Sequence, residues 1–284
     1  MVSDNVKELI GMALAEDIGT GDVTTEYFVS SELRAKAVMA ARKEGVLSGV
    51  HVAAEVFKTV DPELNVQILL EDGDRVSRNA IVMVVEGSAR SLLTAERTAL
   101  NFIQRLSGVA TETRRYVDMI AHTQARILDT RKTTPGYRLL QKNAVKHGGG
   151  TNHRLGLYDR AMVKDNHLMT AGRLSLLQDA IDKLKADKPE VEVQLEVDNL
   201  DQLRDFLTLR GVDHILLDNM SPELMRQAVE MRGRHSRPLL EASGGISMET
   251  LVAVAESGVD FVSVGALTHS APSLDLGLDF KVEA

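Results

Sequence analysis

The stretch HILLDNMSPELMRQAVEMRGRHSRPLLEAS, residues 214–243, carries the pattern that decides the fold. An apolar run over 214–218 is followed by a helical pattern over 221–232 and by a second apolar run over 238–243. Ser221 followed by Pro222 is typical of a helix N-cap and first helical residue. Two short apolar runs joined by a helix predict parallel strands that are linked by a crossover.

The same alternation extends to both sides of this stretch. Strand-like runs lie at 126–130, 161–164, 191–197, 214–218, 238–243 and 261–265, and helical patterns lie at 175–186, 200–209, 221–232 and 247–257. Gly211 and Gly258 stand where helices are expected to stop. Six strands are fewer than the eight of a full α/β barrel, which takes about 250 residues. The pattern predicts a smaller or incomplete parallel α/β barrel, or an open doubly wound sheet.

The first 105 or so residues follow a different pattern. Alternating segments at 35–41, 65–70 and 80–86 surround the turn Asp72-Gly73-Asp74. A long helical pattern follows over about 91–120. It contains Gly108, near which the helix could be broken. We therefore expect an N-terminal α+β domain, closely packed on the barrel because no linker-like stretch separates the two.

Composition excludes several classes of protein. The chain has 284 residues, of which 44% are hydrophobic and 26% charged, and this is typical of a soluble globular protein with one large domain or two. No apolar run approaches the roughly 18 residues of a membrane span, and no secretory signal is visible. The absence of cysteine excludes disulfides, thiolate metal sites and thiol nucleophiles. We expect a cytoplasmic location and no membrane partner.

The charge is unevenly distributed. The chain carries a net charge of −8, which argues against nucleic-acid binding, yet residues 126–167 hold nine basic and three acidic side chains. A cationic segment in an anionic protein favours a small, highly charged anionic ligand. The alternative is a solvated basic helix face.

Charged residues stand at the ends of successive predicted strands. They are Arg131 and Lys132 just after Asp129, then Lys164, Glu196 and Asp218, and the fifth strand ends at 241–243. Because the carboxyl ends of parallel strands meet at one rim, we expect these side chains to converge on a ligand site. The alternative is a ring of ion pairs that closes the barrel mouth.

Glycine-rich turns follow the last two strands. Ser243-Gly244-Gly245 and Gly265-Ala266 expose backbone N–H groups at positions where α/β barrels often bind phosphate, although each is also compatible with a plain turn. Glu196 and Asp218 could hold Mg²⁺, which prefers one or two carboxylates together with substrate oxygens. Pairing with Lys132 and Lys164 would explain the same two acids.

The polar loop at 146–154 contains three consecutive glycines and then His153 and Arg154, which favours an active-site loop. We expect His153 to contact a ligand, and His147 and His167 to serve packing or hydrogen bonding. The histidines do not have the spacing of zinc ligands.

These motifs closely resemble those of the quinolinate phosphoribosyltransferase family, also called nicotinate-nucleotide pyrophosphorylase (carboxylating). The resemblance covers nearly the whole chain and includes Thr130-Arg-Lys-Thr-Thr-Pro-Gly136, Lys146-His-Gly-Gly-Gly150, Asn152-His-Arg154, Val163-Lys-Asp-Asn-His167, Glu16-Asp17-Ile-Gly-Thr-Gly-Asp22-Val-Thr24, Ala95-Glu-Arg97-Thr-Ala-Leu-Asn101, Leu195-Glu196-Val-Asp198, Leu217-Asp218-Asn219, Glu241-Ala-Ser-Gly-Gly-Ile246 and Ser263-Val-Gly-Ala-Leu-Thr-His269.

The resemblance implies a reaction and an architecture. Quinolinate and phosphoribosyl pyrophosphate would give nicotinate mononucleotide, pyrophosphate and CO₂ in NAD biosynthesis, with Mg²⁺ as cofactor. The implied fold is an incomplete, six- to seven-stranded parallel α/β barrel over 109–269 with an N-terminal α+β sandwich domain over 1–108, which the C-terminal segment 270–284 joins. The family forms homodimers in which the N-terminal domain of one subunit covers the barrel mouth of the other.

The resemblance also implies a role for individual residues. Quinolinate would be bound by Arg131, His153, Arg154 and Lys164, with Arg97 contributed by the partner subunit. The phosphoribosyl donor would be bound by Lys132, Ser243, Gly244, Gly245, Gly265 and His269. Lys132, Glu196 and Asp218 would be catalytic, and the two acids would bind the metal.

Three other functions fit the residues less completely. Lys164 could form a Schiff base with a carbonyl substrate, as in phosphate-binding aldolases, but Arg97 and the triple glycine would then have no role. The chain could be a non-catalytic sensor of a phosphorylated metabolite. It could also be a paralogue that acts on another aromatic acid, such as the family-like protein associated with molybdenum transport.

Overall fold

The computed structural model describes residues 2–164, 174–233 and 237–282. The chain divides into two compact units. The first contains residues 1–114, 134–149 and 270–284, and the second contains residues 115–133 and 150–269. Each unit is described here by itself.

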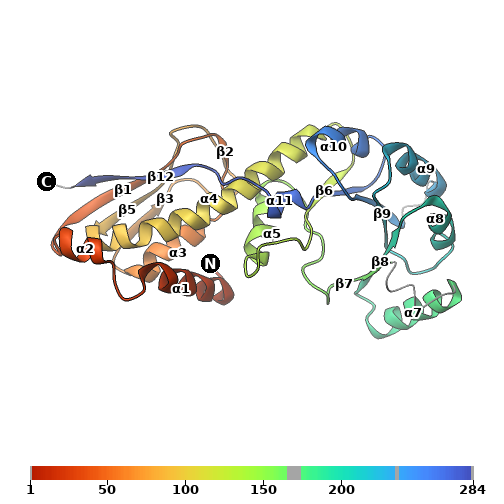
Figure 1. Cartoon of the computed structure of the whole chain (residues 1–284), viewed down its shortest axis with the longest axis horizontal. Coiled ribbons are helices and arrows are strands. Elements are labelled where there is room, and N and C mark those ends of the chain that lie inside the picture. Colours follow the sequence, from red (N-terminus) through yellow and green to blue (C-terminus); the bar gives the residue numbers. More distant parts are fainter. Residues whose placement is uncertain (1, 165–173, 234–236, 283–284) are drawn as a thin grey trace. The chain divides into compact units, whose positions relative to one another are not determined.

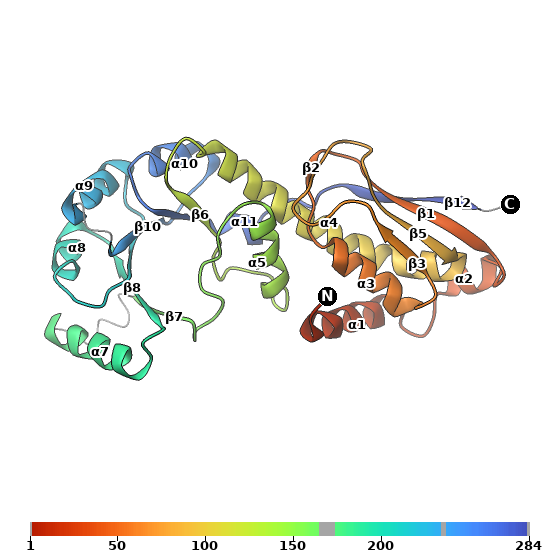
Figure 2. The same cartoon turned by 180° about the vertical axis from the view of Figure 1, so that it is seen from behind.

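The first unit is built on an antiparallel sheet with the strand order β12-β1-β5-β3, and helix α4 runs along one face of this sheet in both views (Figures 1 and 2). A second, two-stranded sheet pairs β2 with β4. The elements are α1 (Asp4–Ile18), α2 (Val23–Phe28), β1 (Arg34–Ala41), β2 (Gly45–Val46), α3 (Val50–Val60), β3 (Asn65–Ile68), β4 (Arg75–Val76), β5 (Ile81–Ser88), α4 (Ala89–Met119), α5 (Arg138–His147) and β12 (Leu276–Val282).

The core of the first unit follows from the alternation that its strands show. Ala37 and Met39 are two residues apart on β1, point to the same side and are fully buried, and Met83 and Val85 on β5 are buried as well. Phe57 on α3 and Phe102 on α4 are among the largest fully buried side chains. The three strands expected near 35–41, 65–70 and 80–86 are present, whereas α1, α3 and β12 had no counterpart among the expected elements.

Helix α4 passes through Gly108 without a break, so the break that the sequence left open is absent. A Cβ atom at Gly108 would lie 2.0 Å from the Pro272 carbonyl oxygen and 2.9 Å from Ser273 Cα. Glycine is therefore required at this position because the backbone at 272–273 approaches the helix closely, and not because the helix bends.

Within the described residues, the second unit is built on a sheet of six strands that are all parallel, in the order β6-β11-β10-β9-β8-β7. Helices α7 to α10 lie on the outer side of the curved sheet (Figure 1). The elements are β6 (Arg126–Leu128), β7 (Arg160–Val163), α7 (Leu174–Asp187), β8 (Glu192–Val197), α8 (Leu200–Phe206), β9 (His214–Asp218), α9 (Pro222–Arg232), β10 (Leu239–Ser243), α10 (Met248–Ala255), β11 (Phe261–Ser263) and α11 (Ala266–His269).

The strand order identifies an incomplete barrel. Strands β7 to β11 follow one another in chain order, and the first strand of the unit, β6, pairs with the last, β11. A doubly wound sheet would reverse its order at a switch point, so this alternative is excluded. Strands β6 and β7 are the two edges, so the prediction of an incomplete α/β barrel with an N-terminal α+β domain is confirmed.

The helix predicted over 221–232, which is α9, begins as expected. The Ser221 hydroxyl accepts a hydrogen bond from the Leu224 N–H at 3.4 Å, Pro222 is the first residue of α9, and Gly233 follows its end with φ +69°. Helix α8, in contrast, ends at Phe206, three residues before the predicted limit.

The segment 134–149 belongs to the first unit by its contacts, whereas the sequence analysis placed it within a barrel domain over 109–269. The Tyr137 ring stacks on Phe102 with a centroid distance of 5.6 Å, and His147 Nδ1 lies 2.9 Å from Ser48 Oγ. The hydrogen bond predicted for His147 is thus present.

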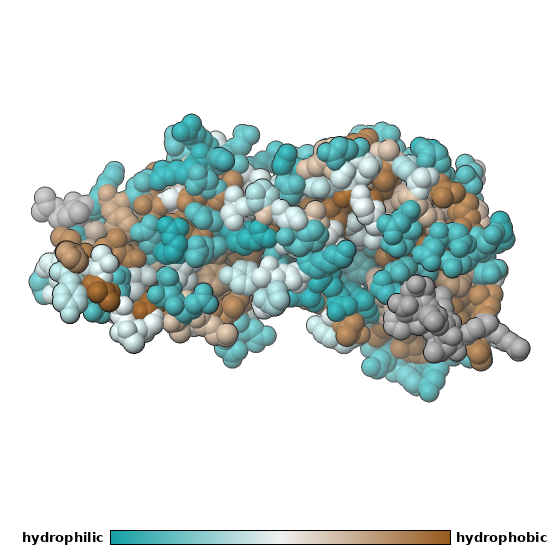
Figure 3. Space-filling model, in the orientation of Figure 1, coloured by the Kyte–Doolittle hydropathy of each residue, from teal (hydrophilic) through white to brown (hydrophobic). Residues whose placement is uncertain are grey.

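Exposed apolar side chains are dispersed on the face drawn in Figure 3, where brown residues lie among teal ones. In the part of the chain that the structure describes, the most exposed large apolar residues are Tyr27 and Phe28 at the end of α2, and Leu157 and Tyr158 in the loop before β7. Of the helices described, none combines the length and the apolar character that a membrane span requires.

The environment of Gly108 generates a stability prediction. Gly108→Ala should lower the free energy of unfolding by about 2 kcal/mol, because the methyl group has to displace backbone atoms rather than a flexible side chain. Equilibrium denaturation in urea measures the change.

Gly11→Ala is the matched control, since Gly11 is also in the interior of a helix and has no atom within 4 Å of a built Cβ. It should raise the free energy of unfolding by about 0.5–1 kcal/mol. Equal effects of the two substitutions would contradict the close approach at Gly108.

Candidate functional site

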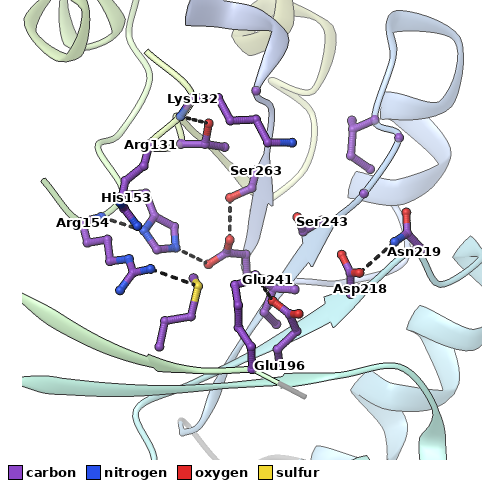
Figure 4. A pocket seen from close by; sticks show the side chains of 18 of the residues that line it. Arg131, Lys132, His153, Arg154, Glu196, Asp218, Asn219, Glu241, Ser243 and Ser263 are labelled. Carbon is purple, nitrogen blue, oxygen red and sulfur yellow. Dashed lines mark hydrogen bonds and ion pairs between the residues drawn. The ribbon is translucent and has the colours of Figure 1, made fainter. Parts of the chain in front are cut away.

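A cavity of about 610 Å³ opens at the carboxyl ends of the parallel strands of the second unit. Its side chains converge from five strands and the connecting loops (Figure 4). The lining residues are Thr130, Arg131, Lys132, His153, Arg154, Met162, Lys164, Glu196, Leu216, Asp218, Asn219, Glu241, Ser243, Gly244, Gly245, Ile246, Ser263, Gly265, Ala266 and His269.

The rim is formed by the residues on which the strands end. Lys164 directly follows β7, Glu196 is the penultimate residue of β8, and Asp218 and Ser243 are the last residues of β9 and β10. Arg131 and Lys132 lie shortly beyond β6. The predicted convergence of Arg131, Lys132, Lys164, Glu196 and Asp218 on one rim is therefore observed.

The loop with the three glycines returns to the rim beside β6. Thr151 forms a parallel bridge with Leu128, and its N–H donates to the Ile127 carbonyl oxygen at 2.8 Å. This contact places His153 and Arg154 on the cavity wall. The His153 N–H donates to Asp129 Oδ1 at 2.8 Å, and Asp129 is fully buried.

Arg154 is held by groups of β7. Its guanidinium donates to the Arg160 carbonyl oxygen at 3.1 Å and to the Met162 sulfur at 3.6 Å. Burial lowers the pKa of Arg154, and the neighbouring charge of Arg131 lowers it further. Arginine nevertheless stays charged in proteins, so the wall carries two adjacent, partly desolvated cations that favour an anionic ligand.

Lys164 and Glu196 form an ion pair across neighbouring strands. The Nζ–Oε2 distance is 2.5 Å, and the side chains are 43% and 11% exposed. The sequence analysis named this pairing as one explanation for the acid, and it is present. Because the lysine side chain is still almost half exposed to the cavity, the pair leaves its ammonium group accessible to a ligand.

The turn after β10 is shaped by Gly244. Its φ is +94°, and a Cβ atom there would lie 2.1 Å from Asn219 Oδ1. Asn219, itself at φ +52°, donates through Nδ2 to Asp218 Oδ2 at 2.7 Å. Glycine thus allows the backbone of this turn to approach the end of β9, as a loop that contacts an anion through N–H groups requires.

Lys132 and His269 lie around the second glycine turn. A Cβ atom at Gly265 would be 3.2 Å from both Lys132 Cδ and His269 Nε2. The Thr268 hydroxyl donates to the Lys132 carbonyl oxygen at 2.8 Å, which ties the loop after β6 to α11. Both predicted phosphate-binding turns therefore border the same cavity as the cations.

Glu241 lies below the rim and was not among the predicted site residues. It is 1% exposed, and its carboxylate accepts from Ser263 Oγ at 2.5 Å and from Gln194 Nε2 at 2.7 Å. Burial by itself raises the pKa of Glu241, but hydrogen bonds from His153, Ser263 and Gln194 outweigh it, so the pKa is lowered. The period of two in a strand could have found this residue, because Glu241 stands two positions before Ser243 and shares its face.

Two predicted residues lie elsewhere. Arg97 is exposed on α4 in the first unit and does not line this cavity, so its contribution from a partner subunit stays a prediction. His167, together with positions 165–166 of the same motif, lies outside the described residues.

A metal would have two carboxylates available at the rim. The described residues contain no group of three or more His, Cys, Asp or Glu that could hold an ion alone. Glu196 and Asp218 face one cavity, however, and Mg²⁺ commonly takes one or two protein carboxylates and completes its shell with substrate oxygens and water. The donor set therefore fits Mg²⁺ bound together with a phosphorylated substrate.

This fold and site define a class of protein: an incomplete α/β barrel whose cavity at the strand ends is lined by cations and glycine turns, which suits small, multiply anionic ligands. Comparison with known proteins identifies the family within this class. The model for the N-terminal domain of quinolinate phosphoribosyl transferase matches residues 22–107, and the model for its C-terminal domain matches residues 109–279. The chain belongs to the quinolinate phosphoribosyltransferase family.

Individual relatives agree with this assignment. The nicotinate-nucleotide pyrophosphorylase [carboxylating] of Mycobacterium leprae is 44% identical over 280 residues, which cover 97% of each chain. The probable enzyme of the same name from Bacillus subtilis is 41% identical over 96% of this chain and 93% of its own. The solved structure of the Francisella tularensis nicotinate-nucleotide pyrophosphorylase superposes with a TM-score of 0.92 at 41% identity, covering 99% and 98% of the two chains.

The hydrogen bond from Ser263 to the buried Glu241 generates a prediction. Ser263→Ala should lower the free energy of unfolding at pH 7 by about 1.5–3 kcal/mol, the usual contribution of a hydrogen bond to a charged group. Because the pKa of Glu241 is lowered in the folded protein, the stability from its ionisation is present above the unfolded pKa of about 4.3. The difference should therefore shrink as the pH falls through the folded pKa.

Ser257→Ala is the control, since the buried Ser257 donates only to the neutral Val254 carbonyl oxygen at 2.6 Å. Its loss should cost about 0.5–1.5 kcal/mol and should not depend on pH. A pH-independent effect at Ser263 would show that Glu241 is not ionised in the folded protein.

Proposed function

We infer that this chain transfers the phosphoribosyl group of phosphoribosyl pyrophosphate to quinolinate and releases pyrophosphate and CO₂, which yields nicotinate mononucleotide for NAD biosynthesis. One observation carries the assignment to this site: four cationic side chains and two glycine turns border the same cavity. A planar dicarboxylate and a multiply phosphorylated sugar together require both features.

Quinolinate is proposed to bind at the wall that carries Arg131, Arg154 and Lys164. The planar guanidinium groups suit bidentate contacts with the two carboxylates, and their desolvation strengthens these contacts. His153 borders the same wall. Arg97 from a second copy of the chain is proposed to complete this subsite, which implies a homodimer.

The phosphoribosyl donor is proposed to bind on the opposite side, between Lys132 and the turns after β10 and β11. Ser243, Gly244, Gly245 and Gly265 would present polar groups to the 5-phosphate, with His269 beside them. Lys132 would lie near the donor's pyrophosphate.

Glu196 and Asp218 are proposed to hold Mg²⁺ and to contact the ribose hydroxyl groups. When bound, the ion would offset negative charge on the departing pyrophosphate. Lys132 would add a second positive charge on the same side.

The reaction then requires mainly positioning. The bond between ribose C1 and the pyrophosphate oxygen breaks, and the quinolinate nitrogen uses its lone pair to form the new C1–N bond. The ring becomes a pyridinium, which accepts the electron pair of the adjacent C–CO₂⁻ bond as CO₂ leaves, and a proton then replaces CO₂ at that carbon. Arg131, Arg154 and Lys164 would hold the ring in line with C1 throughout.

The alternative role of Lys164 as a Schiff-base nucleophile is disfavoured by its contacts and by the family. Its Nζ is engaged with the Glu196 carboxylate at 2.5 Å, and both domains match models of a phosphoribosyl transferase. The cytoplasmic location stays a prediction from the sequence.

Turnover of purified protein tests the function directly. With phosphoribosyl pyrophosphate and Mg²⁺, we expect nicotinate mononucleotide and CO₂ from quinolinate, no product from nicotinate, and loss of activity on addition of EDTA that excess Mg²⁺ restores. Product from nicotinate would contradict the dicarboxylate assignment. Binding of phosphoribosyl pyrophosphate without turnover would favour a sensor or a paralogue.

The Arg131→Ala variant tests the quinolinate subsite. Losing a charge-assisted bidentate contact of about 3 kcal/mol should raise the KM for quinolinate about a hundredfold and lower kcat/KM accordingly. Arg204→Ala is the control, because Arg204 is 67% exposed on α8 and pairs only with Asp201 at 2.7 Å in the described residues. Steady-state kinetics with a near-normal KM in Arg131→Ala would disprove the assignment.

A further inference from the structure

Both oxygens of the buried Glu241 carboxylate contact hydrogen-bonding groups of the protein. Oε1 accepts from the Ser263 hydroxyl at 2.5 Å, and Oε2 accepts from Gln194 Nε2 at 2.7 Å and lies 3.2 Å from His153 Nε2 (Figure 4). The side chain is 1% exposed. Glu241 is therefore a structural anion beneath the cavity and not a free acid or base.

The orientation of the Gln194 side chain shows that a hydrogen-bond donor is favoured next to the Glu241 carboxylate. Its side chain is fully buried and gives its nitrogen to Glu241, while its oxygen has no hydrogen-bond partner among the described residues. An unpaired buried acceptor costs about 1–3 kcal/mol. The fold tolerates this cost, and the Gln194 amide nitrogen donates to Glu241 as the Ser263 hydroxyl does.

His153 connects Glu241 to the quinolinate wall in a single tautomer. Its Nδ1 accepts a hydrogen bond from the Arg154 backbone N–H at 2.7 Å, so Nδ1 carries the lone pair. The ring proton is then on Nε2 and points to Glu241 Oε2 at 3.2 Å. Both nitrogens of the ring are thus engaged with the protein.

Further hydrogen bonds, which do not involve Glu241, hold His153 and Arg154 in place. Asp129 Oδ1 accepts the His153 N–H at 2.8 Å, and the Arg154 guanidinium reaches the Arg160 carbonyl oxygen at 3.1 Å. Two buried carboxylates, Asp129 and Glu241, thus clamp residue 153, and the residue they orient is Arg154.

We propose that Glu241 is a positioning residue for quinolinate binding: it selects the Nε2–H tautomer of His153, which in turn holds Arg154 against the carboxylate of the substrate. His153 acts through its ring as a spacer and donates no proton to the reacting molecules. The proposal rests on the proposed function and refines it, since it moves His153 from ligand contact to support.

The chemistry explains why a carboxylate is needed. An ionised Glu offers two charged acceptor oxygens to its three donors, whereas the amide of a Gln keeps one acceptor oxygen and carries no charge. In Glu241→Gln the N–H₂ group can face Ser263, whose hydroxyl can also accept, so His153 is left with a neutral and weaker acceptor. This would loosen the hold of the ring on the Arg154 loop.

The test compares Glu241→Gln with Glu256→Gln. Glu256 is a suitable control because it also contacts a histidine, His122, at 3.0 Å, but it does not line the cavity. In Glu241→Gln we expect the KM for quinolinate to rise at least tenfold while the KM for phosphoribosyl pyrophosphate changes less than twofold. Glu256→Gln should leave both constants unchanged. Equal changes of both KM values, or no change, would overturn the proposal.

Nitrogen-15 spectra of the histidine rings supply a readout that a general loss of stability would not move. In the wild-type protein at pH 7, His153 should show an unprotonated Nδ1 and a protonated Nε2, and Glu241→Gln should shift the Nε2 resonance because its acceptor loses its charge. An imidazolium or an Nδ1–H tautomer in the wild type would contradict the proposal. The tautomer is measured without substrate, so it tests the network even if the protein fails to turn over quinolinate, which would disprove the proposed function separately.

A second variant covers the case in which Glu241→Gln does not fold. His153→Gln keeps an N–H donor toward Glu241 but cannot exchange a proton with the substrate. We expect kcat within threefold of the wild type and a raised KM for quinolinate. A fall of kcat by more than a hundredfold at unchanged KM would show that His153 takes part in proton transfer and would overturn the proposal.

Discussion

The parallel register of six strands, with the first strand of the unit paired to the last, is the constraint on which the site depends. Parallel pairing sends every connecting helix to the outside of the sheet and brings all strand ends to one rim. Residues as far apart in the chain as Arg131 and His269 therefore border one cavity. At β6, an edge strand of this sheet, the loop through Thr151 bridges to Leu128 and brings Arg154 to the same wall.

Charge in the barrel is arranged in two levels. Cations and the two accessible acids occupy the rim, where ligand and solvent can compensate them, while Glu241 is compensated entirely by protein donors one level below. A buried ion is tolerated only when its lone pairs are satisfied. The hydrogen bonds of Glu241 can therefore stay the same while the rim residues exchange ligands, and this suits a site that binds two anionic substrates and releases three products.

Glycine serves different purposes at different places in the chain. At Gly108 the helix is regular, and the missing side chain makes room for the backbone at Pro272. At Gly244 the backbone itself has φ +94°, and it also approaches Asn219. The same residue type in a sequence is compatible with a break, a contact or a turn, because only the neighbouring chain, which is distant in sequence, distinguishes them.

The sequence by itself determined the strand and helix alternation and the convergence of charged strand ends, because these depend on local periodicity and on a general property of parallel sheets. The rim residues Lys164, Glu196 and Asp218 were found in this way. The sequence pattern left an incomplete barrel and a doubly wound sheet open, and the strand order decided between them. The tertiary structure alone decided that Lys164 pairs with Glu196, that the segment 134–149 packs with the first unit, and that Glu241 and Ser263 support His153 from below. These features depend on which side chains meet across strands far apart in the chain, and no local pattern contains that information.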